Sequence, residues 1–484
     1  MKNIFILALS FLLFSCKGAK KENSVTAKRP NILFCIADDW GWPHAGVYGD
    51  KTVKTPAFDR LANEGVLFQN AFISSPSCTP SRSAILTGQH FWRLGEGANL
   101  WSTLDVNIPV YPLLLEKYGY HTGHWRKAWG PGDLKKGGYS KTNPAGKNYN
   151  KGLKSFLDTK PTDAPFCFWL GSSDPHRPYE KGSGMASGIN IDAIKLPDFY
   201  PDDSCIRSDI ADYYFEVQRF DADVYNAIKL LEERGELENT IIVMTGDHGM
   251  PFPRCKGNLY DWGSRVPLAI RWGAKVPKNR IVNDFVSLTD LAVTFLEAAQ
   301  IAIPKEMTGK SLLPILQSNK QGWIENQRKQ VVYGRERHTP AQLAPSLNGY
   351  PSRAIRTKRF LYIKNLKPER WPAGVMEGAT HPMSSFSDAD NGATKTVLMN
   401  LKNTEASKYY DLSFAKRPAD ELYDVVRDPF QIKNLAEDPQ YKTTIKKLSK
   451  ELYEVLRKTK DPRITDTGSE FDRYPYNAPY KLKE

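Results

Sequence analysis

Three short segments of the chain are almost wholly apolar and end abruptly in polar residues. They are residues 31–37 (NILFCIA), 166–170 (FCFWL) and 240–245 (TIIVMT). Continuous apolar runs of this length are typical of strands buried on both faces of a parallel sheet. The pattern therefore predicts three buried strands.

Polar residues follow each predicted strand. They are DDWG at 38–41, GSSDPHR at 171–177 and GDHG at 246–249. Ligands of open α/β sheets bind outside the carboxyl ends of the strands, so we expect these three clusters to converge on one crevice.

A helical pattern lies between two of these strands, at residues 210–234, where apolar side chains recur at steps of three and four. Strands that alternate with helices indicate an α/β domain, here residues 30–344. Later in the chain, residues 332–334 and 360–363 resemble short separate strands and residues 441–458 a helix. We place a smaller α+β subdomain at 345–484.

Composition narrows the class of protein. The 484 residues are 40% hydrophobic, and 67 Lys+Arg against 54 Asp+Glu give a net charge of +13. These fractions are those of a globular protein. No run of five like charges is present, so we expect no nucleic-acid partner. The excess of basic over acidic residues favours an anionic substrate. The alternative is that the excess charge only forms a solvated surface.

The first 29 residues carry an export signal. Residues 4–14 are an apolar run too short to span a membrane, which is typical of a signal peptide, here residues 1–16. Residues 13–16 (LFSC) resemble a bacterial lipobox, so we expect a lipid anchor on Cys16, with plain secretion as the alternative. Residues 17–29 are polar and form a flexible tether. Both alternatives export the protein to the periplasm or cell envelope.

The remaining cysteines do not suggest a disulfide framework. They are odd in number and have no paired close spacing: Cys35, Cys78, Cys167, Cys205 and Cys255.

Clustered carboxylates at the predicted strand ends suggest a metal site. Asp38, Asp39 and Asp247 would repel one another without a cation, and their oxygens suit a hard divalent ion. His248 is a softer donor, so Ca²⁺, Mg²⁺ and Mn²⁺ all stay open. Taken alone, Asp38-Asp39 would more often be a turn with helix-capping carboxylates.

A second cluster surrounds Cys78 in the segment SCTPSRSAILTG. With Thr79 as cap and Pro80 in the first turn, Cys78 would lie at a helix N-terminus, where an anion is favoured. Arg82 would lie one turn along on the same face. The alternative is a buried cysteine ahead of a capped helix.

These motifs together resemble a known family. CTPSR at 78–82, followed by LTG, resembles the signature of type I sulfatases, in which the cysteine is oxidised to formylglycine. DDWG and GDHG resemble the two metal motifs of that family, and ELYD at 421–424 its C-terminal signature. The resemblance runs from about residue 30 to 460. It implies an alkaline-phosphatase-like fold: a large mixed, mostly parallel sheet sandwiched by helices, with a smaller C-terminal α+β subdomain.

The resemblance also implies residue roles. The catalytic set is Cys78, Arg82, Lys127, His176 and Lys256, and the metal set is Asp38, Asp39, Cys78, Asp247 and His248. Hydrated formylglycine attacks sulfur, the three cations neutralise the sulfuryl oxygens, and His176 protonates the leaving group. Where the family often has a second histidine, this chain has Trp129.

Substrate recognition is predicted less sharply. Asp174, Arg177, His338 and Arg353 fall where the family often places pocket residues, with ion pairs between the two domains as the alternative. DPHR at 174–177 resembles the sulfamidase branch, and related bacterial carbohydrate O-sulfatases share parts of the pattern.

The sequence thus predicts an exo-acting sulfatase on sulfated sugars of glycosaminoglycans or mucins, matured by a formylglycine-generating enzyme. The alternatives are an O-sulfatase on galactose or hexosamine sulfate and a phosphatase or phosphodiesterase of the same superfold. A catalytically silent glycan-binding lipoprotein is a further alternative.

Overall fold

A computed structural model describes residues 28–140, 142–343, 345–376 and 385–479. Its largest feature is a sheet in the order β4-β3-β5-β1-β6-β7-β2-β8. The strands are β1 (Asn31–Ala37), β2 (Val66–Phe72), β3 (His121–Trp125), β4 (Lys147–Asn148), β5 (Phe166–Gly171), β6 (Thr240–Gly246), β7 (Arg265–Arg271) and β8 (Arg280–Ser287). Only β7 runs antiparallel to its neighbours, so the sheet is mixed and mostly parallel, as predicted.

The three strands predicted from apolar runs are neighbours at the centre of this sheet. β1 lies between β5 and β6, is parallel to both, and all three are buried along their whole length. Alternate residues of β1 enter opposite layers: Leu33 packs into one core and Phe34 into the other. Helices must therefore cover both faces of the sheet.

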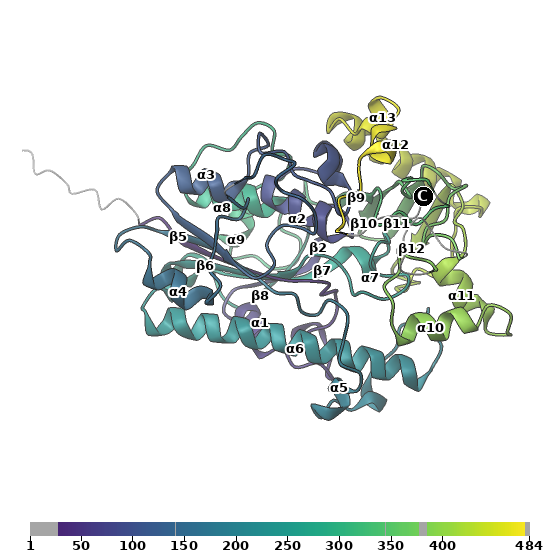
Figure 1. Ribbon diagram of the computed structural model, residues 1–484, viewed down its shortest axis with the longest axis horizontal. Helices are drawn as coiled ribbons and strands as arrows, with labels where there is room; N and C mark the ends of the chain where they lie inside the picture. Colours follow the sequence, from purple (N-terminus) through teal and green to yellow (C-terminus); the bar gives the residue numbers. More distant parts are fainter. Residues whose placement is uncertain (1–27, 141, 344, 377–384, 480–484) are drawn as a thin grey trace, which may run out of the picture.

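Figure 1 shows these two helical layers. One contains α1 (Pro56–Asn63), α4 (Gly152–Asp158), α5 (Ser183–Ala186) and the long α6 (Ser204–Glu233); the other contains α2 (Cys78–Thr87), α3 (Tyr111–Lys117), α8 (Asp290–Ala298) and α9 (Leu313–Leu316). α6 begins six residues before its predicted start because the Asp203 side chain caps it, accepting from the backbone N–H groups of Cys205 and Ile206.

A second, antiparallel sheet has the order β12-β11-β10-β9. Its strands are β9 (Gln330–Arg335), β10 (Ser352–Thr357), β11 (Phe360–Asn365) and β12 (Asp420–Asp424). The helices of this part are α10 (Ala393–Asn400), α11 (Ser407–Phe414), α12 (Lys442–Lys458), α13 (Pro462–Thr465) and α14 (Glu470–Arg473). The leucines of α12 pack on one face of the sheet. The sheet itself begins at Gln330, while the domain boundary near 345 stays a prediction.

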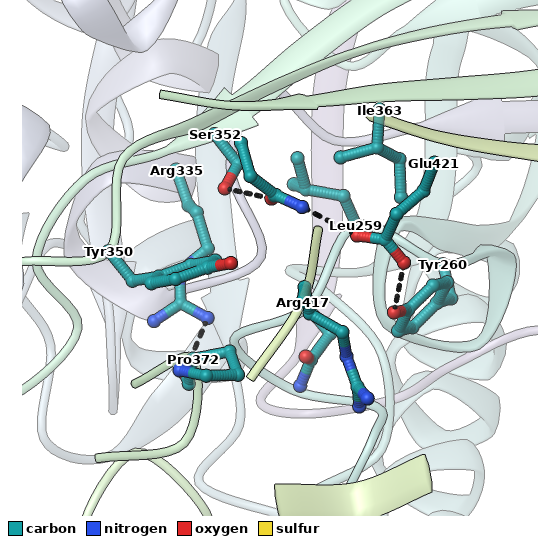
Figure 2. Close-up of a pocket in the computed structure, with 11 residues that line it drawn as sticks. Leu259, Tyr260, Arg335, Tyr350, Ser352, Ile363, Pro372, Arg417 and Glu421 are labelled. Atoms are coloured by element: carbon teal, nitrogen blue, oxygen red, sulfur yellow. Dashed lines mark hydrogen bonds between the residues drawn. The ribbon is translucent and has the colours of Figure 1, made fainter. Parts of the chain in front are cut away.

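The other face of the small sheet packs against the main domain around a buried carboxylate. Glu421 of β12 accepts hydrogen bonds from Tyr260 (2.8 Å), Tyr423 (2.6 Å) and Asn365 (2.7 Å). Tyr260 directly precedes α7 (Asp261–Ser264) of the main domain, and Figure 2 shows it pointing at Glu421. The cavity beside this cluster is about 20 Å³, far smaller than a ligand pocket. The role of the ELYD glutamate here is therefore to join the two parts of the chain.

The predicted signal peptide and most of the tether lie outside the described residues. In the described ranges, no helix is both long enough and apolar enough to cross a membrane. The five cysteines from Cys35 to Cys255 are all free thiols, as expected.

Arg353 of β10 is held in a second buried polar network. Its guanidinium pairs with Asp461 (2.5 Å) and Glu336 (2.8 Å) and donates to the carbonyl oxygens of Arg335 and Ser352. All three charged side chains are fully buried. Removing one partner of such a network leaves uncompensated buried charge.

We predict that Arg353→Ala lowers the free energy of unfolding by about 3–5 kcal/mol. Denaturant unfolding followed by circular dichroism measures this loss. Arg427→Ala is the matched control, because that side chain is 74% exposed, and its effect should be under about 1 kcal/mol. Equal effects of the two substitutions would contradict the buried network.

Candidate active site

Four neighbouring strands of the large sheet deliver side chains to one edge. β1 ends before Asp38, β6 before Asp247, β5 before the loop of Asp174 and His176, and β3 before Lys127. All four strands are parallel, so their carboxyl ends meet at the same edge. The predicted convergence of three strands is confirmed, and β3 adds a fourth.

The backbone turns sharply between Asp38 and Asp39. Asp39 has φ of 76°, in the left-handed region, and its N–H donates to Asp247 Oδ1 at 2.9 Å. An extended strand would point successive side chains to opposite faces of the sheet. The turn instead brings both carboxylates to the same centre.

The five predicted metal ligands lie together in this centre. Ligand atoms of Asp38, Cys78, Asp247 and His248 all lie within 4.8 Å of one another. Asp39 Oδ1 lies 3.1 Å from His248 Nε2 and, although buried, has no hydrogen-bond partner among the residues that the structure describes. A buried carboxylate oxygen without a donor is costly unless a cation compensates it. The donor set therefore fits a divalent metal ion.

Cys78 is the first residue of α2 and is buried among these ligands. Its Sγ lies 3.5 Å from Asp38 Oδ1 and 3.3 Å from His248 Nε2. The predicted cap, Thr79, is wrong: the helix starts two residues earlier than that cap implies, directly after Ser77. The Thr79 hydroxyl instead donates to the carbonyl oxygen of Pro131 at 2.5 Å.

The Cys78 thiol is poorly suited to act as a nucleophile itself. Burial raises its pKa well above the ordinary value, and Lys127 opposes that shift only in part. The thiol therefore stays protonated near neutral pH, whereas thiolates are the reactive form of cysteine.

Three cations surround the carboxylates, each paired with a different one. Arg82 Nε donates to Asp247 (2.8 Å), Lys127 Nζ to Asp38 (2.5 Å) and Lys256 Nζ to Asp39 (2.8 Å). Burial lowers the pKa of both lysines, but their carboxylate partners more than offset this, so both pKa values are raised. Both lysines therefore carry positive charge at neutral pH.

His176 lies on the pocket side of this centre. Its Nδ1 lies 2.5 Å from the carbonyl oxygen of Arg177. A carbonyl only accepts, so Nδ1 carries a proton, and Nε2 is the ring nitrogen left for other contacts. His176, Asp38 and Lys127 line a pocket of about 560 Å³. This volume is that of a small-molecule site.

The four residues predicted to bind the substrate lie in different places relative to the pocket. Asp174 lines this pocket, and Arg177 does so while held by Asp209 through two 2.8 Å hydrogen bonds. His338 is buried behind the cysteine, with Nδ1 2.8 Å from Ser77 Oγ, and burial lowers its pKa. Arg353 is not brought to the pocket. Instead, Arg353 pairs with Glu336 and Asp461 in the buried network described above.

Trp129 occupies the position where the resemblance implied a histidine. Its ring is buried and its Nε1 donates to Ser83 Oγ of α2 at 2.7 Å. In this chain, the residue helps to fix the helix that carries Cys78.

Three residues near the site escaped the sequence analysis. Asp390 lies 3.1 Å from Lys256 Nζ, and Glu216 and Arg219 of α6 line the pocket. Asp390 follows no strand and belongs to no motif, so no signal identified it. Glu216 and Arg219 carried a weak signal, since a polar pair at a three-residue spacing adjoins the apolar face of a helix.

Comparison with known proteins agrees with this geometry. Residues 30–301, more than half of the chain, match the family model described as Sulfatase, and residues 246–408 match the N-sulphoglucosamine sulphohydrolase C-terminal model. An ulvan-active sulfatase of Formosa agariphila is 28% identical, over 94% of this chain and 88% of that protein. The human N-sulphoglucosamine sulphohydrolase is 29% identical, over 90% and 92%.

A solved structure shares the fold at lower identity. The phosphonate monoester hydrolase of Agrobacterium radiobacter aligns with a TM-score of 0.65 at 17% identity, over 89% of this chain and 96% of that chain. The predicted alkaline-phosphatase-like fold is thereby confirmed. The family match over residues 30–301 contains every motif that forms the centre around Cys78, and the chain therefore belongs to the sulfatase family of sulfuric ester hydrolases.

Proposed function

We propose that the protein is an exo-acting carbohydrate sulfatase whose nucleophile is formylglycine derived from Cys78. One observation carries the proposal: a buried cysteine at a helix start lies among three carboxylates and three cations, next to a pocket of about 560 Å³. A maturation enzyme that oxidises Cys78 is the partner this requires, and export to the periplasm or cell envelope is part of the proposal.

The unmodified Cys78 thiol is a poor nucleophile, so the nucleophile has to come from the modified residue. One hydroxyl of hydrated formylglycine at position 78 gives its proton to Asp247 and attacks sulfur, as the bond between sulfur and the sugar oxygen or nitrogen breaks. The second hydroxyl then loses its proton to water, the aldehyde re-forms as the C–O bond to sulfate breaks, and addition of water restores the hydrate. Asp38, Asp39, Asp247, His248 and residue 78 would hold a divalent cation, for which we propose Ca²⁺, and the bound cation would supply positive charge that favours the attack.

Other side chains of the protein stabilise the developing charge and deliver the proton. Arg82, Lys127 and Lys256 stabilise negative charge that develops on the sulfuryl oxygens. Nε2 of His176 delivers the proton to the departing sugar oxygen or nitrogen. Arg82 also donates to the carbonyl oxygens of Lys127 (3.0 Å) and Ala128 (2.8 Å), which fixes the loop of its neighbouring cation.

For the substrate, we propose a sulfated sugar with the sulfate at the chain end, of the N-sulfoglucosamine type. The names of the human relative and of the C-terminal family model support this choice. The ulvan-active relative favours an O-sulfate as the second candidate. A phosphatase is disfavoured, because enzymes of that kind in this superfold generally use serine or threonine at the position of Cys78.

We predict that the matured enzyme releases sulfate from defined sulfated mono- and disaccharides. N-sulfoglucosamine should react fastest, and a sulfate on an internal residue should not react. Ion chromatography of free sulfate measures the reaction, with Cys78→Ala as the inactive control. Release of phosphate from sugar phosphates without release of sulfate would contradict the proposal.

We predict that His176→Ala lowers kcat/KM on a sugar sulfate by about 10²-fold or more, because a sugar alkoxide needs a proton as it leaves. The loss should be much smaller on an activated aryl sulfate, whose phenolate leaves unaided. His176→Gln keeps a hydrogen-bonding side chain without an acid and should behave like His176→Ala. Equal losses on both substrates would mean that His176 binds the sulfate group instead.

We predict that removal of metal with a chelator abolishes sulfate release and that added Ca²⁺ restores it. Asp39→Ala should remain inactive at any Ca²⁺ concentration while keeping its far-ultraviolet circular dichroism. Asp163→Ala, at an exposed position, should match the wild type. Full activity in a sample shown by elemental analysis to hold no metal would refute the metal site.

A further inference from the structure

The far wall of the active-site pocket is built from one loop and one helix. Asp174 follows β5, and its carbonyl oxygen accepts from Asp38 N–H at 3.0 Å, which ties the loop to the metal motif. Glu216 and Arg219 lie one turn apart on α6, a helix of 30 residues. All three side chains line the pocket. The wall is therefore positioned by rigid elements next to the reacting centre.

These three side chains contact one another across the two elements. The Arg219 guanidinium donates to both oxygens of Glu216, at 3.0 and 2.9 Å, and lies 3.4 Å from Asp174 Oδ2. The side chains of Glu216 and Asp174 are only 9% and 12% exposed, whereas that of Arg219 is 53% exposed. A helix-surface ion pair would leave its carboxylate in water. Here the carboxylates are withdrawn into the pocket.

The charge of this wall differs from that of the end around Cys78. The wall contains the carboxylates of Asp174 and Glu216 and the guanidinium of Arg219, and Glu180, which also lines the pocket, is a third carboxylate. The further cation at this end, Arg177, is already paired with Asp209. At the end around Cys78, the proposed divalent cation would add to three side-chain cations, so that end favours an anion. Burial and the neighbouring Asp174 raise the pKa of Glu216 to about 7. Close to neutral pH, the Glu216 carboxyl can therefore either accept a hydrogen bond or donate one.

We propose that Glu216 and Arg219, together with Asp174, recognise the sugar that carries the sulfate, and that this sugar offers hydroxyl or ammonium donors and no carboxylate. This inference rests on the carbohydrate sulfatase function proposed above. A substrate with sulfate at one end and hydrogen-bond donors at the other matches the polarity of the pocket. A uronic acid would place its carboxylate against Asp174, where like charges repel at low dielectric, while the Arg219 guanidinium is already bound by both oxygens of Glu216.

The test compares Glu216→Gln with Glu233→Gln, an exposed position on the same helix. Glu216→Gln should lower kcat/KM on the preferred sugar sulfate by about 10-fold or more, the usual effect of losing a hydrogen bond to a charged group. It should also weaken inhibition by free glucosamine by a similar factor. Inhibition by inorganic sulfate should stay within about twofold, because that anion occupies only the cationic end. Glu233→Gln should change none of these.

Two further measurements identify which group of the sugar donates to the wall and whether a carboxylate on the sugar is excluded. Inhibition by N-acetylglucosamine separates the two donors: a loss equal to that for glucosamine assigns hydroxyls, and a smaller loss assigns the ammonium. The wild type should have a higher kcat/KM on the sugar sulfate than on a matched uronate sulfate. Glu216→Gln should lower the ratio of these two kcat/KM values.

The inference is overturned if Glu216→Gln matches Glu233→Gln, or if inhibition by sulfate weakens as much as inhibition by glucosamine. It is also overturned if the wild type prefers the uronate sulfate. Failure of the proposed function looks different, since the wild type would then release sulfate from no sugar in the panel.

Discussion

Repulsion among Asp38, Asp39 and Asp247 is the constraint on which the site depends. Three carboxylates buried within one centre are tolerated only when each is compensated, and each has its own cationic partner from a different part of the chain. Among the described residues, one buried oxygen, Asp39 Oδ1, is still left without a donor. A divalent cation held beside residue 78 would give this oxygen its missing partner.

The fold supplies this arrangement through two simple geometric devices. Parallel strands in the order β3-β5-β1-β6 bring the ends of distant segments to one edge of the sheet. Helix α2 then points its N-terminus, with Cys78, at that edge. The C-terminal part of the chain also contacts this site. Its sheet is joined to the main domain by the hydrogen bond from Tyr260 to Glu421, and its residue Asp390 forms an ion pair with Lys256.

The sequence predicted the elements of this site better than their contacts. β1 was predicted to the residue, because a fully buried parallel strand has a continuous apolar pattern that stops where the polar edge begins. Arg353 shows the limit: a lone arginine in a short strand looks the same whether it binds a substrate or an ion-pair network. Glu216 and Asp390 were missed because their roles come from tertiary neighbours, Asp174 and Lys256, that lie far away in the sequence.

The central claim is that residue 78 acts as an aldehyde hydrate and not as a thiol. Mass spectrometry of the tryptic peptide that contains residue 78, taken from active protein made with a maturation system, tests it directly. The account predicts an aldehyde in place of the thiol, no alkylation at this position, and activity proportional to the converted fraction. A fully alkylatable Cys78 in a preparation with full sulfatase activity would contradict it.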